Sequence, residues 1–297
     1  MVGSSVLRKF QDSNDQYDVI GSTRDDTDLF SYESTYKKIK DVNPEVVINA
    51  AARVGGILAN STKRTEFILE NLKINMNIFE SCKENSQIKI INLGSSCIYP
   101  LNAKDPINED SFMEGRLEPT NSPYAIAKIT GIEIGRSLNL EYGHKIINLM
   151  PTNLYGPFDN FSKEESHVIP GLISRMNEAK EKNQETFPIW GTGTPLREFL
   201  FVEDLAEAIE FMIDKNTDSD LYNVGSGEEI SILELTEKIK LGIDYKGELV
   251  LDESKPDGNP RKLLDSSRIN KLGWKSKTSL DDGLSQTIEW FYSNVKS

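Results

Sequence analysis

The sequence is poor in cysteine, in histidine and in positive charge for its length. Its 297 residues include two cysteines and two histidines, and the formal net charge at pH 7 is −13. A partner that presents a nucleic-acid backbone requires a basic surface, so this charge balance argues against DNA or RNA as a partner. Two cysteines make no disulfide framework, which favours a reducing compartment.

Long apolar runs, internal repeats and low-complexity tracts are also lacking. No apolar stretch approaches the length that spans a membrane, and no signal-peptide core is visible. We therefore expect a cytoplasmic protein without a membrane partner, and the sequence predicts no metal site. With 37% hydrophobic residues, the chain can bury the core of one large domain or of two smaller ones.

The most informative stretch runs from residue 90 to residue 128. Residues 90–93 form an apolar run that is typical of a strand, and Gly94, Ser95, Ser96 and Cys97 follow it. Tyr124 and Lys128 come later, just after a proline at a plausible helix start.

Tyr124 and Lys128 are four residues apart, so on a helix they share a face. A nearby ammonium should lower the pKa of the tyrosine and make it a usable proton donor or acceptor. Ser95 could bond the same substrate oxygen. A Tyr-x-x-x-Lys spacing is expected about once by chance in a chain with this many tyrosines, so the spacing alone is a weak signal.

Strand-like and helix-like segments alternate in the first half of the chain. Apolar runs at residues 46–52, 88–93 and 145–150 read as buried strands, and residues 67–83 carry apolar side chains at helical spacing. This alternation predicts an α/β fold with a Rossmann-like, doubly wound parallel sheet. The rhythm weakens near residue 161, which predicts a smaller C-terminal α/β domain.

The N-terminal end departs from the expected pattern. Residues 1–10 read as the start of an amphipathic helix, whereas a dinucleotide-binding fold begins with a strand and a glycine-rich turn. We therefore expect that the first strand is missing, either because the chain is truncated or its start was placed too late, or because the protein is genuinely shortened. Residues 17–21 read as the second strand.

Three motifs connect the chain to a known family. Residues 94–100, 118–128 and 151–157 resemble the extended short-chain dehydrogenase/reductases and, within them, the GDP-L-fucose synthases. The similarity extends over the whole sequence. It implies an NADP cofactor, a GDP-sugar substrate and a homodimer. It also implies that residues 1–160 and 199–226 form the NADP-binding domain and that residues 161–198 and 227–297 bind the nucleotide sugar. Residues 197–206 resemble the family's strand-to-helix segment, which returns to the main sheet.

The resemblance also implies which residues contact the cofactor. Gly3 corresponds to the last glycine of the family's Gly-x-x-Gly-x-x-Gly turn, and Arg24 to the arginine that selects NADP over NAD. The other implied cofactor contacts are Asp28, Leu29, Ala51, Ala52, Leu93, Gly94, Ser95, Ser96, Tyr124, Lys128, Pro151, Thr152, Asn153, Leu154 and His167. Without the resemblance, Arg24 would read equally well as a solvated loop residue.

The implied chemistry has two stages on GDP-4-keto-6-deoxy-D-mannose: epimerisation at C3 and C5 through enolates, then reduction of the C4 ketone by NADPH. The implied catalytic residues are Ser95, Cys97, Tyr124, Lys128 and His167, with Cys97 and His167 as the acid–base pair of the epimerisation. A free cysteine is more often a small buried hydrophobe, and a lone histidine more often structural. We expect the other histidine, His144, on the surface.

The implied substrate-binding residues are Arg175, Trp190, Arg197 and Asp257. Arginines suit phosphates, and an aromatic ring can pack on a flat base or sugar. Alternatively, Trp190 would fill the core and the arginines would lie on the surface.

Two other functions stay open at this point. One is another nucleotide-sugar 4-epimerase or 4,6-dehydratase of the same fold, which needs no thiol at position 97. The other is a catalytically silent nucleotide-sugar-binding protein, which the missing strand suggests.

Overall fold

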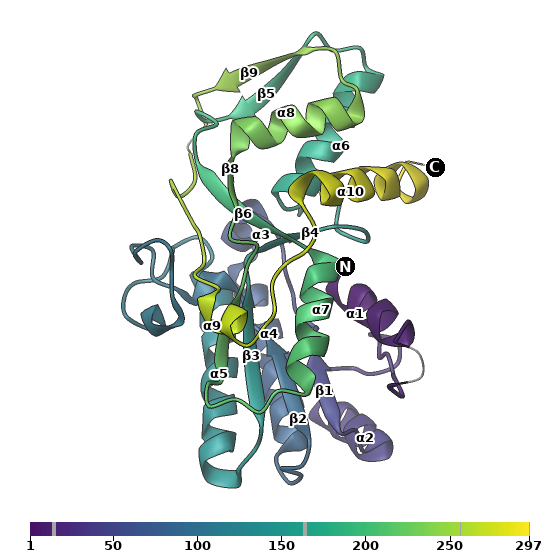
Figure 1. Ribbon diagram of the computed structural model, residues 1–297, viewed down its shortest axis with the longest axis vertical. Coiled ribbons are helices and arrows are strands. Elements are labelled where there is room, and N and C mark those ends of the chain that lie inside the picture. Colours follow the sequence, from purple (N-terminus) through teal and green to yellow (C-terminus); the bar gives the residue numbers. More distant parts are fainter. Residues whose placement is uncertain (14–15, 163–164, 256, 297) are drawn as a thin grey trace.

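The computed structural model describes residues 1–13, 16–162, 165–255 and 257–296. Its lower lobe in Figure 1 is built on a parallel sheet. The strand order is β1 (Val46–Asn49), β2 (Lys89–Leu93), β3 (Ile146–Pro151) and β7 (Leu221–Val224), and each neighbouring pair is parallel. The predicted parallel sheet is confirmed.

Helices cover both faces of this sheet. Ile90 and Ile146 face α2 (Tyr32–Val42), α4 (Arg64–Cys82) and α5 (Ser122–Tyr142). Ile91 and Ile147, each one residue further along, face α1 (Val2–Gln11) and α7 (Val202–Ile213). Successive strand side chains point to opposite faces, so the continuous apolar runs fill two cores. The doubly wound arrangement is therefore confirmed.

Residues 17–21 do not form the predicted strand. They lie in no ladder, and Ile20 is 53% exposed. A strand requires a hydrogen-bonded neighbour. In a dinucleotide-binding fold the first strand lies between the second strand and the next part of the sheet, and the residues that the structure describes do not supply a strand there.

The upper lobe in Figure 1 has its own core. The parallel pair β5 (Thr186–Trp190) and β9 (Glu248–Asp252) packs with α6 (Val168–Glu181), α8 (Ile232–Ile243) and α10 (Leu280–Asn294). A second sheet, in the order β4 (Asn153–Tyr155), β6 (Leu196–Phe201) and β8 (Glu229–Ser231), connects to the lower lobe. The boundaries predicted for the two domains stay a prediction.

The segment from 197 to 206 was expected to return to the main sheet as a strand and a helix. Its strand β6 instead pairs with β4 and β8, and only the following helix α7 packs on the main sheet. The short elements α3 (Ile57–Thr62), η1 (Ser96–Ile98), η2 (Glu109–Ser111) and α9 (Ser267–Lys271) complete the described chain.

His144 lies inside the protein and not on its surface. It is 1% exposed, and its Nε2 lies 3.0 Å from the carbonyl oxygen of Lys83, because the turn after α5 folds this residue against the end of α4. No helix in the described part of the chain has both the length and the apolarity needed to cross a membrane.

Candidate active site

The carboxyl end of β2 and the start of α5 meet at a buried lysine. The Nζ atom of Lys128 donates to the carbonyl oxygen of Leu93 at 2.7 Å. At the next residue, Gly94, a Cβ atom would lie 2.1 Å from the Cε atom of Met150. Any larger residue at 94 would have to displace the end of the Met150 side chain, which fills the space beside this glycine.

Ser95, Cys97 and Tyr124 lie together next to this junction. The Ser95 hydroxyl lies close enough to Tyr124 to lower its pKa, and Ser95 Oγ accepts from the backbone N–H of Cys97 at 3.2 Å. The Tyr124 ring packs edge-on against Phe67, with 6.3 Å between the ring centroids. The structure thus brings together four of the five catalytic residues that the resemblance implies: Ser95, Cys97, Tyr124 and Lys128.

The electrostatics of Tyr124 differ from the prediction. Burial raises the pKa of Tyr124, and the nearby Cys97 raises it further, while the hydroxyl of Ser95 lowers it. The Lys128 Nζ is directed at Leu93 and lies 5.7 Å from the Tyr124 ring centroid. Burial also lowers the pKa of Lys128 to about 8. Desolvation therefore outweighs the expected effect of the ammonium, and Tyr124 is held as a protonated phenol.

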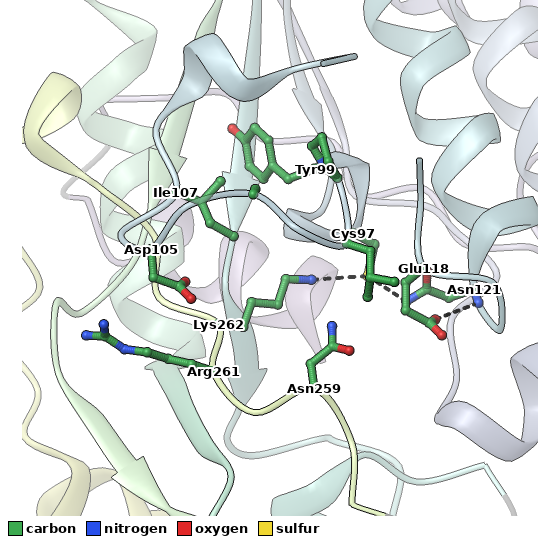
Figure 2. Close-up of a pocket in the computed structure, with 12 residues that line it drawn as sticks. Cys97, Tyr99, Asp105, Ile107, Glu118, Asn121, Asn259, Arg261 and Lys262 are labelled. Carbon is green, nitrogen blue, oxygen red and sulfur yellow. Dashed lines mark hydrogen bonds between the residues drawn. The ribbon is translucent and has the colours of Figure 1, made fainter. Parts of the chain in front are cut away.

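Cys97 opens on a small cavity of about 60 Å³, which Figure 2 shows. Two nitrogen atoms point at the cysteine: Nδ2 of Asn121 lies 3.3 Å from the sulfur, and Nζ of Lys262 lies 4.0 Å from it. The sequence analysis did not single out either residue. Their only signal was position, since Asn121 stands just before the Ser-Pro-Tyr motif and Lys262 ends the turn-rich segment 255–262.

Among the described residues, no hydrogen bond or ion pair joins His167 to Cys97 or Tyr124. His167 is exposed at the N-terminal end of α6. Burial raises the pKa of Asp159, and His167 acts in the opposite direction on that carboxyl. The preceding residue Ser166 packs on Gly56, where a Cβ atom would lie 2.6 Å from the Ser166 carbonyl oxygen. The catalytic role of His167 stays a prediction.

Most of the implied cofactor contacts lie at the carboxyl ends of strands, where open α/β sheets bind ligands. Ala51 and Ala52 follow β1, Gly94 to Ser96 follow β2, and Pro151 to Leu154 lie at the end of β3 and in β4. Arg24 and Asp28 are exposed in the loop before α2, and Leu29 accepts a 2.8 Å hydrogen bond from Asn77. These roles stay predictions.

The four implied substrate residues gather in the upper lobe. The Arg175 guanidinium lies 5.1 Å from the ring centroid of Trp190, which is 60% exposed and so does not fill the core. Arg197 donates to the carbonyl oxygen of Asn259 at 2.6 Å, and Asp257 accepts from the backbone N–H of Thr192 at 2.9 Å. Burial lowers the pKa of both arginines. A partly desolvated arginine gains most from an anionic ligand.

A row of buried asparagines crosses the main sheet, and the sequence analysis missed it. Asn49, Asn92 and Asn148 are aligned in register on β1, β2 and β3. Nδ2 of Asn49 donates to Asn92 at 3.2 Å, and Nδ2 of Asn92 donates to Asn148 at 2.9 Å. Asn75 accepts from Asn49 and donates to the carbonyl oxygen of Ala127 at 3.0 Å, which ties the row to α4 and α5.

Comparisons with known proteins agree with this architecture. Residues 1–225 match the model of the NAD dependent epimerase/dehydratase family. The chain is 48% identical over 295 residues to a putative GDP-L-fucose synthase 2 of Arabidopsis thaliana, covering 99% of this chain and 90% of that protein. It is 44% identical to the GDP-L-fucose synthase of Escherichia coli K12, covering 99% and 94%.

Among solved structures, a GDP-L-fucose synthetase from Naegleria fowleri bound to NADP superposes with a TM-score of 0.91 at 27% identity, covering all of this chain and 92% of that one. The resemblance found in the sequence motifs is thus confirmed over nearly the full length. The chain belongs to the NAD dependent epimerase/dehydratase family and, within it, to the GDP-L-fucose synthases.

Proposed function

We propose that this protein converts GDP-4-keto-6-deoxy-D-mannose to GDP-L-fucose, by epimerisation at C3 and C5 followed by NADPH-dependent reduction at C4. The observation that carries the proposal is the thiol of Cys97 beside the hydroxyls of Ser95 and Tyr124 at the carboxyl end of β2. Reduction alone would not need a thiol there. The relatives named GDP-L-fucose synthase, at 44–48% identity, support the same activity.

The raised pKa of Tyr124 suits both stages. A protonated phenol can donate a hydrogen bond to the C4 oxygen, and Ser95 can donate a second. These bonds would stabilise the enolate that forms when a proton leaves C3 or C5. In the reduction Tyr124 would give its proton to the C4 oxygen. Cys97 and His167 would serve as the base and the acid of the epimerisation.

The residues present fit NADP. At Gly3, in the first turn of α1, a Cβ atom would meet only Ala50 at 4.0 Å, so the backbone at this helix N-terminus is open to a close approach by the pyrophosphate. Arg24 is exposed and suits a 2′-phosphate. Lys128, together with the residues after β1, β2 and β3, would hold the nicotinamide half. When bound, NADPH supplies the reducing equivalent for C4.

The upper lobe would hold the GDP part of the substrate. Arg175 and Arg197 carry the positive charge for the two phosphates, Trp190 offers an exposed ring, and Asp257 lies next to Arg197. We also propose that the enzyme is a homodimer and that it works in the cytoplasm. Two free cysteines, Cys82 and Cys97, suit a reducing compartment.

The test is to incubate the protein with GDP-4-keto-6-deoxy-D-mannose and NADPH in D₂O and to analyse the product by NMR. We expect GDP-L-fucose with deuterium at C3 and C5. Cys97→Ser should lose this deuterium and keep part of the C4 reduction. A product without deuterium at C3 and C5 would favour a simple 4-epimerase, and GDP-sugar binding without turnover would favour the silent binding protein.

A further inference from the structure

The sulfur of Cys97 lies between two nitrogen donors that come from different parts of the chain. The amide of Asn121 lies 3.3 Å away at the start of α5, and the ammonium of Lys262 lies 4.0 Å away on the segment that leaves the upper lobe. Figure 2 shows both side chains extending toward the cysteine from different directions. Donors on two sides favour a negatively charged acceptor between them.

Asn121 is at the N-cap position of α5, yet its side chain does not cap the helix. Asparagine is among the residues preferred at an N-cap because its side-chain oxygen accepts from the first turn. Here Nδ2 points at the sulfur, and the buried Oδ1 has no partner. The contact with Cys97 thus replaces the cap. It also places the sulfur at the positive end of a 21-residue helix, where thiolates are stabilised.

The backbone holds Lys262 firmly in place. Leu263 donates to the carboxylate of Asp105 at 3.0 Å, and Leu264 forms a parallel bridge with Ile107. Upstream, Leu196 donates to the carbonyl oxygen of Pro260 at 2.9 Å. Lys262 therefore cannot move freely with its loop.

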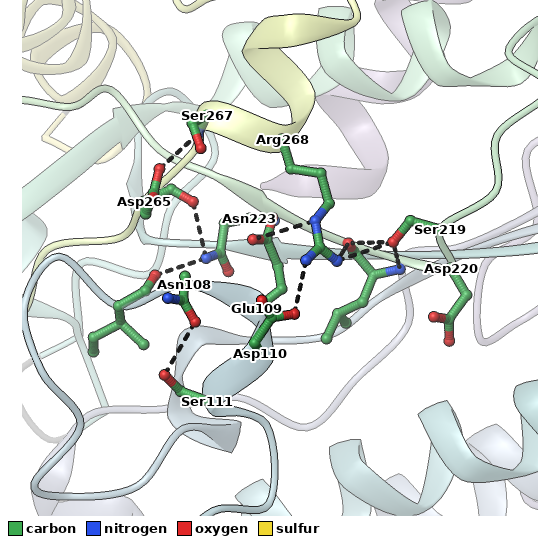
Figure 3. Close-up of polar contacts among 12 residues, drawn as sticks. Asn108, Glu109, Asp110, Ser111, Ser219, Asp220, Asn223, Asp265, Ser267 and Arg268 are labelled. Atoms are coloured by element: carbon green, nitrogen blue, oxygen red, sulfur yellow. Dashed lines mark hydrogen bonds and ion pairs between the residues drawn. The ribbon is translucent and has the colours of Figure 1, made fainter.

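Figure 3 shows the polar contacts that fix the partner segment of this bridge. The buried carboxylate of Glu109 accepts from the backbone N–H of Asn223 at 2.9 Å. Arg268 lies 3.6 Å from Glu109 and 3.0 Å from Asp110. Nδ2 of Asn223 donates to the carbonyl oxygens of Ile107 and Asp265 at 2.9 and 3.1 Å. These bonds join η2, β7 and α9 around the bridge next to Lys262.

The other charged and titratable groups around Cys97 are largely engaged elsewhere. Glu118 accepts from the backbone of Thr120 and Asn121, and Lys262 helps to lower the pKa of Glu118. Arg261 pairs with Glu229. Asp105 accepts from the backbone N–H of Leu263, and the Tyr99 hydroxyl donates to Asn223. Tyr124 faces the Ser95 hydroxyl, which lowers its pKa. Among the described residues that line this cavity, Lys262 is thus the one whose positive charge lies next to the sulfur.

We propose that Lys262 and Asn121 are positioning residues that hold Cys97 as a thiolate in the resting protein. The use of this thiolate in catalysis rests on the proposed function. There, the sulfur would take a proton from the carbon next to the ketone: the S–H bond forms, the C–H bond breaks, and its electron pair moves to the C4 oxygen, which Ser95 and Tyr124 stabilise. A second acid on the opposite face, in the proposed function His167, then gives a solvent-derived proton to the same carbon, and the electron pair of the enolate forms the new C–H bond.

The experiment measures the rate at which iodoacetamide alkylates Cys97 between pH 5 and 10, with each cysteine peptide followed by mass spectrometry. Cys82 is fully buried and serves as an internal reference, because burial raises its pKa to about 12 and only unfolded protein should react there. We expect Lys262→Gln to move the midpoint of the rate profile of Cys97 upward by about one pH unit, which is about a tenfold slower reaction at pH values well below the midpoint of the parent protein.

Three further variants make the test specific. Asn121→Ala should move the midpoint in the same direction, and Lys262→Arg, which keeps the charge, should stay near the parent value. Lys255→Gln removes an exposed ammonium from the same turn-rich segment and should leave the profile unchanged. If Lys262→Gln leaves the midpoint in place while Cys82 stays protected, the proposal is overturned. An equal shift in Lys255→Gln would overturn it too, since the effect would then be one of net charge.

The same variants separate this proposal from the proposed function. Lys262→Gln should lose more deuterium incorporation at C3 and C5 than C4 reduction, and its epimerisation should recover at higher pH. If the parent protein shows the low alkylation midpoint and Lys262→Gln raises it, but neither turns over the GDP-sugar, the thiolate proposal stands and the proposed function fails.

Discussion

Lys128 shows how one residue can serve a site at a cost in stability. Its ammonium is buried and donates to the carbonyl oxygen of Leu93, and burial lowers its pKa from 10.5 to about 8. Between pH 8 and 10.5 the unfolded chain therefore binds more protons at this residue than the folded protein does. The free energy of unfolding should rise with pH across this window, because the unfavourable buried charge is lost.

We expect Lys128→Met to lack this rise. The free energy of unfolding of the parent protein, minus that of the variant, should increase by about 2 kcal/mol between pH 7.5 and 10. Urea unfolding at both pH values, without cofactor, measures it. Lys255→Met removes an exposed ammonium and should give the same difference at both pH values. A pH-independent difference for Lys128→Met would mean that Lys128 is better solvated than the structure indicates.

At the scale of residues, spacing in the sequence predicted that Tyr124 and Lys128 share a face of one helix, and they do lie close together. It could not predict which effect sets the pKa of Tyr124, because burial depends on packing by distant segments such as Phe67. The contacts of Cys97 with Asn121 and Lys262 were out of reach for the same reason. Lys262 is 165 residues away from Cys97 along the chain.

At the scale of elements, the asparagine row is a repeated feature that the sequence does carry. Three apolar runs contain the similar segments Val-Ile-Asn49, Ile-Ile-Asn92 and Ile-Ile-Asn148. The parallel register of the strands places the three asparagines side by side. Each amide pairs with the next, so strands β1 to β3 are joined by side chains as well as by backbone. Buried polar networks of this kind are stable only while every member keeps its partner.

We expect Asn92→Leu to lower the free energy of unfolding by about 2–4 kcal/mol, because it removes the acceptor of one buried N–H of Asn49 and the donor to the buried Oδ1 of Asn148. Leucine is close to asparagine in volume, so the loss should come from the hydrogen bonds. Urea unfolding monitored by circular dichroism measures the change. Asn294→Leu, at the exposed end of α10, should change it by less than about 0.5 kcal/mol. An equal effect of the two substitutions would contradict this role.

The sequence predicted most elements because their periodicity is local. The runs at β1, β2 and β3 and the helices α1 and α4 were identified from apolar spacing, and the start of α5 from its proline and the spacing of Tyr124 and Lys128. Two predictions failed where pairing decides the outcome. Residues 17–21 have the composition of a strand, but no described strand pairs with them. Strand β6 pairs with β4 and β8 and not with the main sheet. Which strands become neighbours is a property of the whole chain.

At the scale of the molecule, helices α4 and α5 present exposed apolar side chains in the lower lobe. Arg64, at the start of α4, donates to Ser122 Oγ at the start of α5 at 3.2 Å, so the two helices begin at the same level. Leu69 and Ile126, each about one turn further on, are 50% and 44% exposed. Exposed apolar residues on two adjacent helices favour a helical interface between copies, and support the proposed homodimer.

We expect the protein to have twice the mass of one chain when measured by light scattering after size-exclusion chromatography. Leu69→Glu should shift it toward the monomer at micromolar concentration, since two carboxylates related by a two-fold axis would be buried near each other. Leu241→Glu is the matched control, because Leu241 is 80% exposed on α8 in the upper lobe. If both variants keep the mass of a dimer, the interface lies elsewhere; if the parent protein has the mass of one chain, the homodimer proposal is wrong.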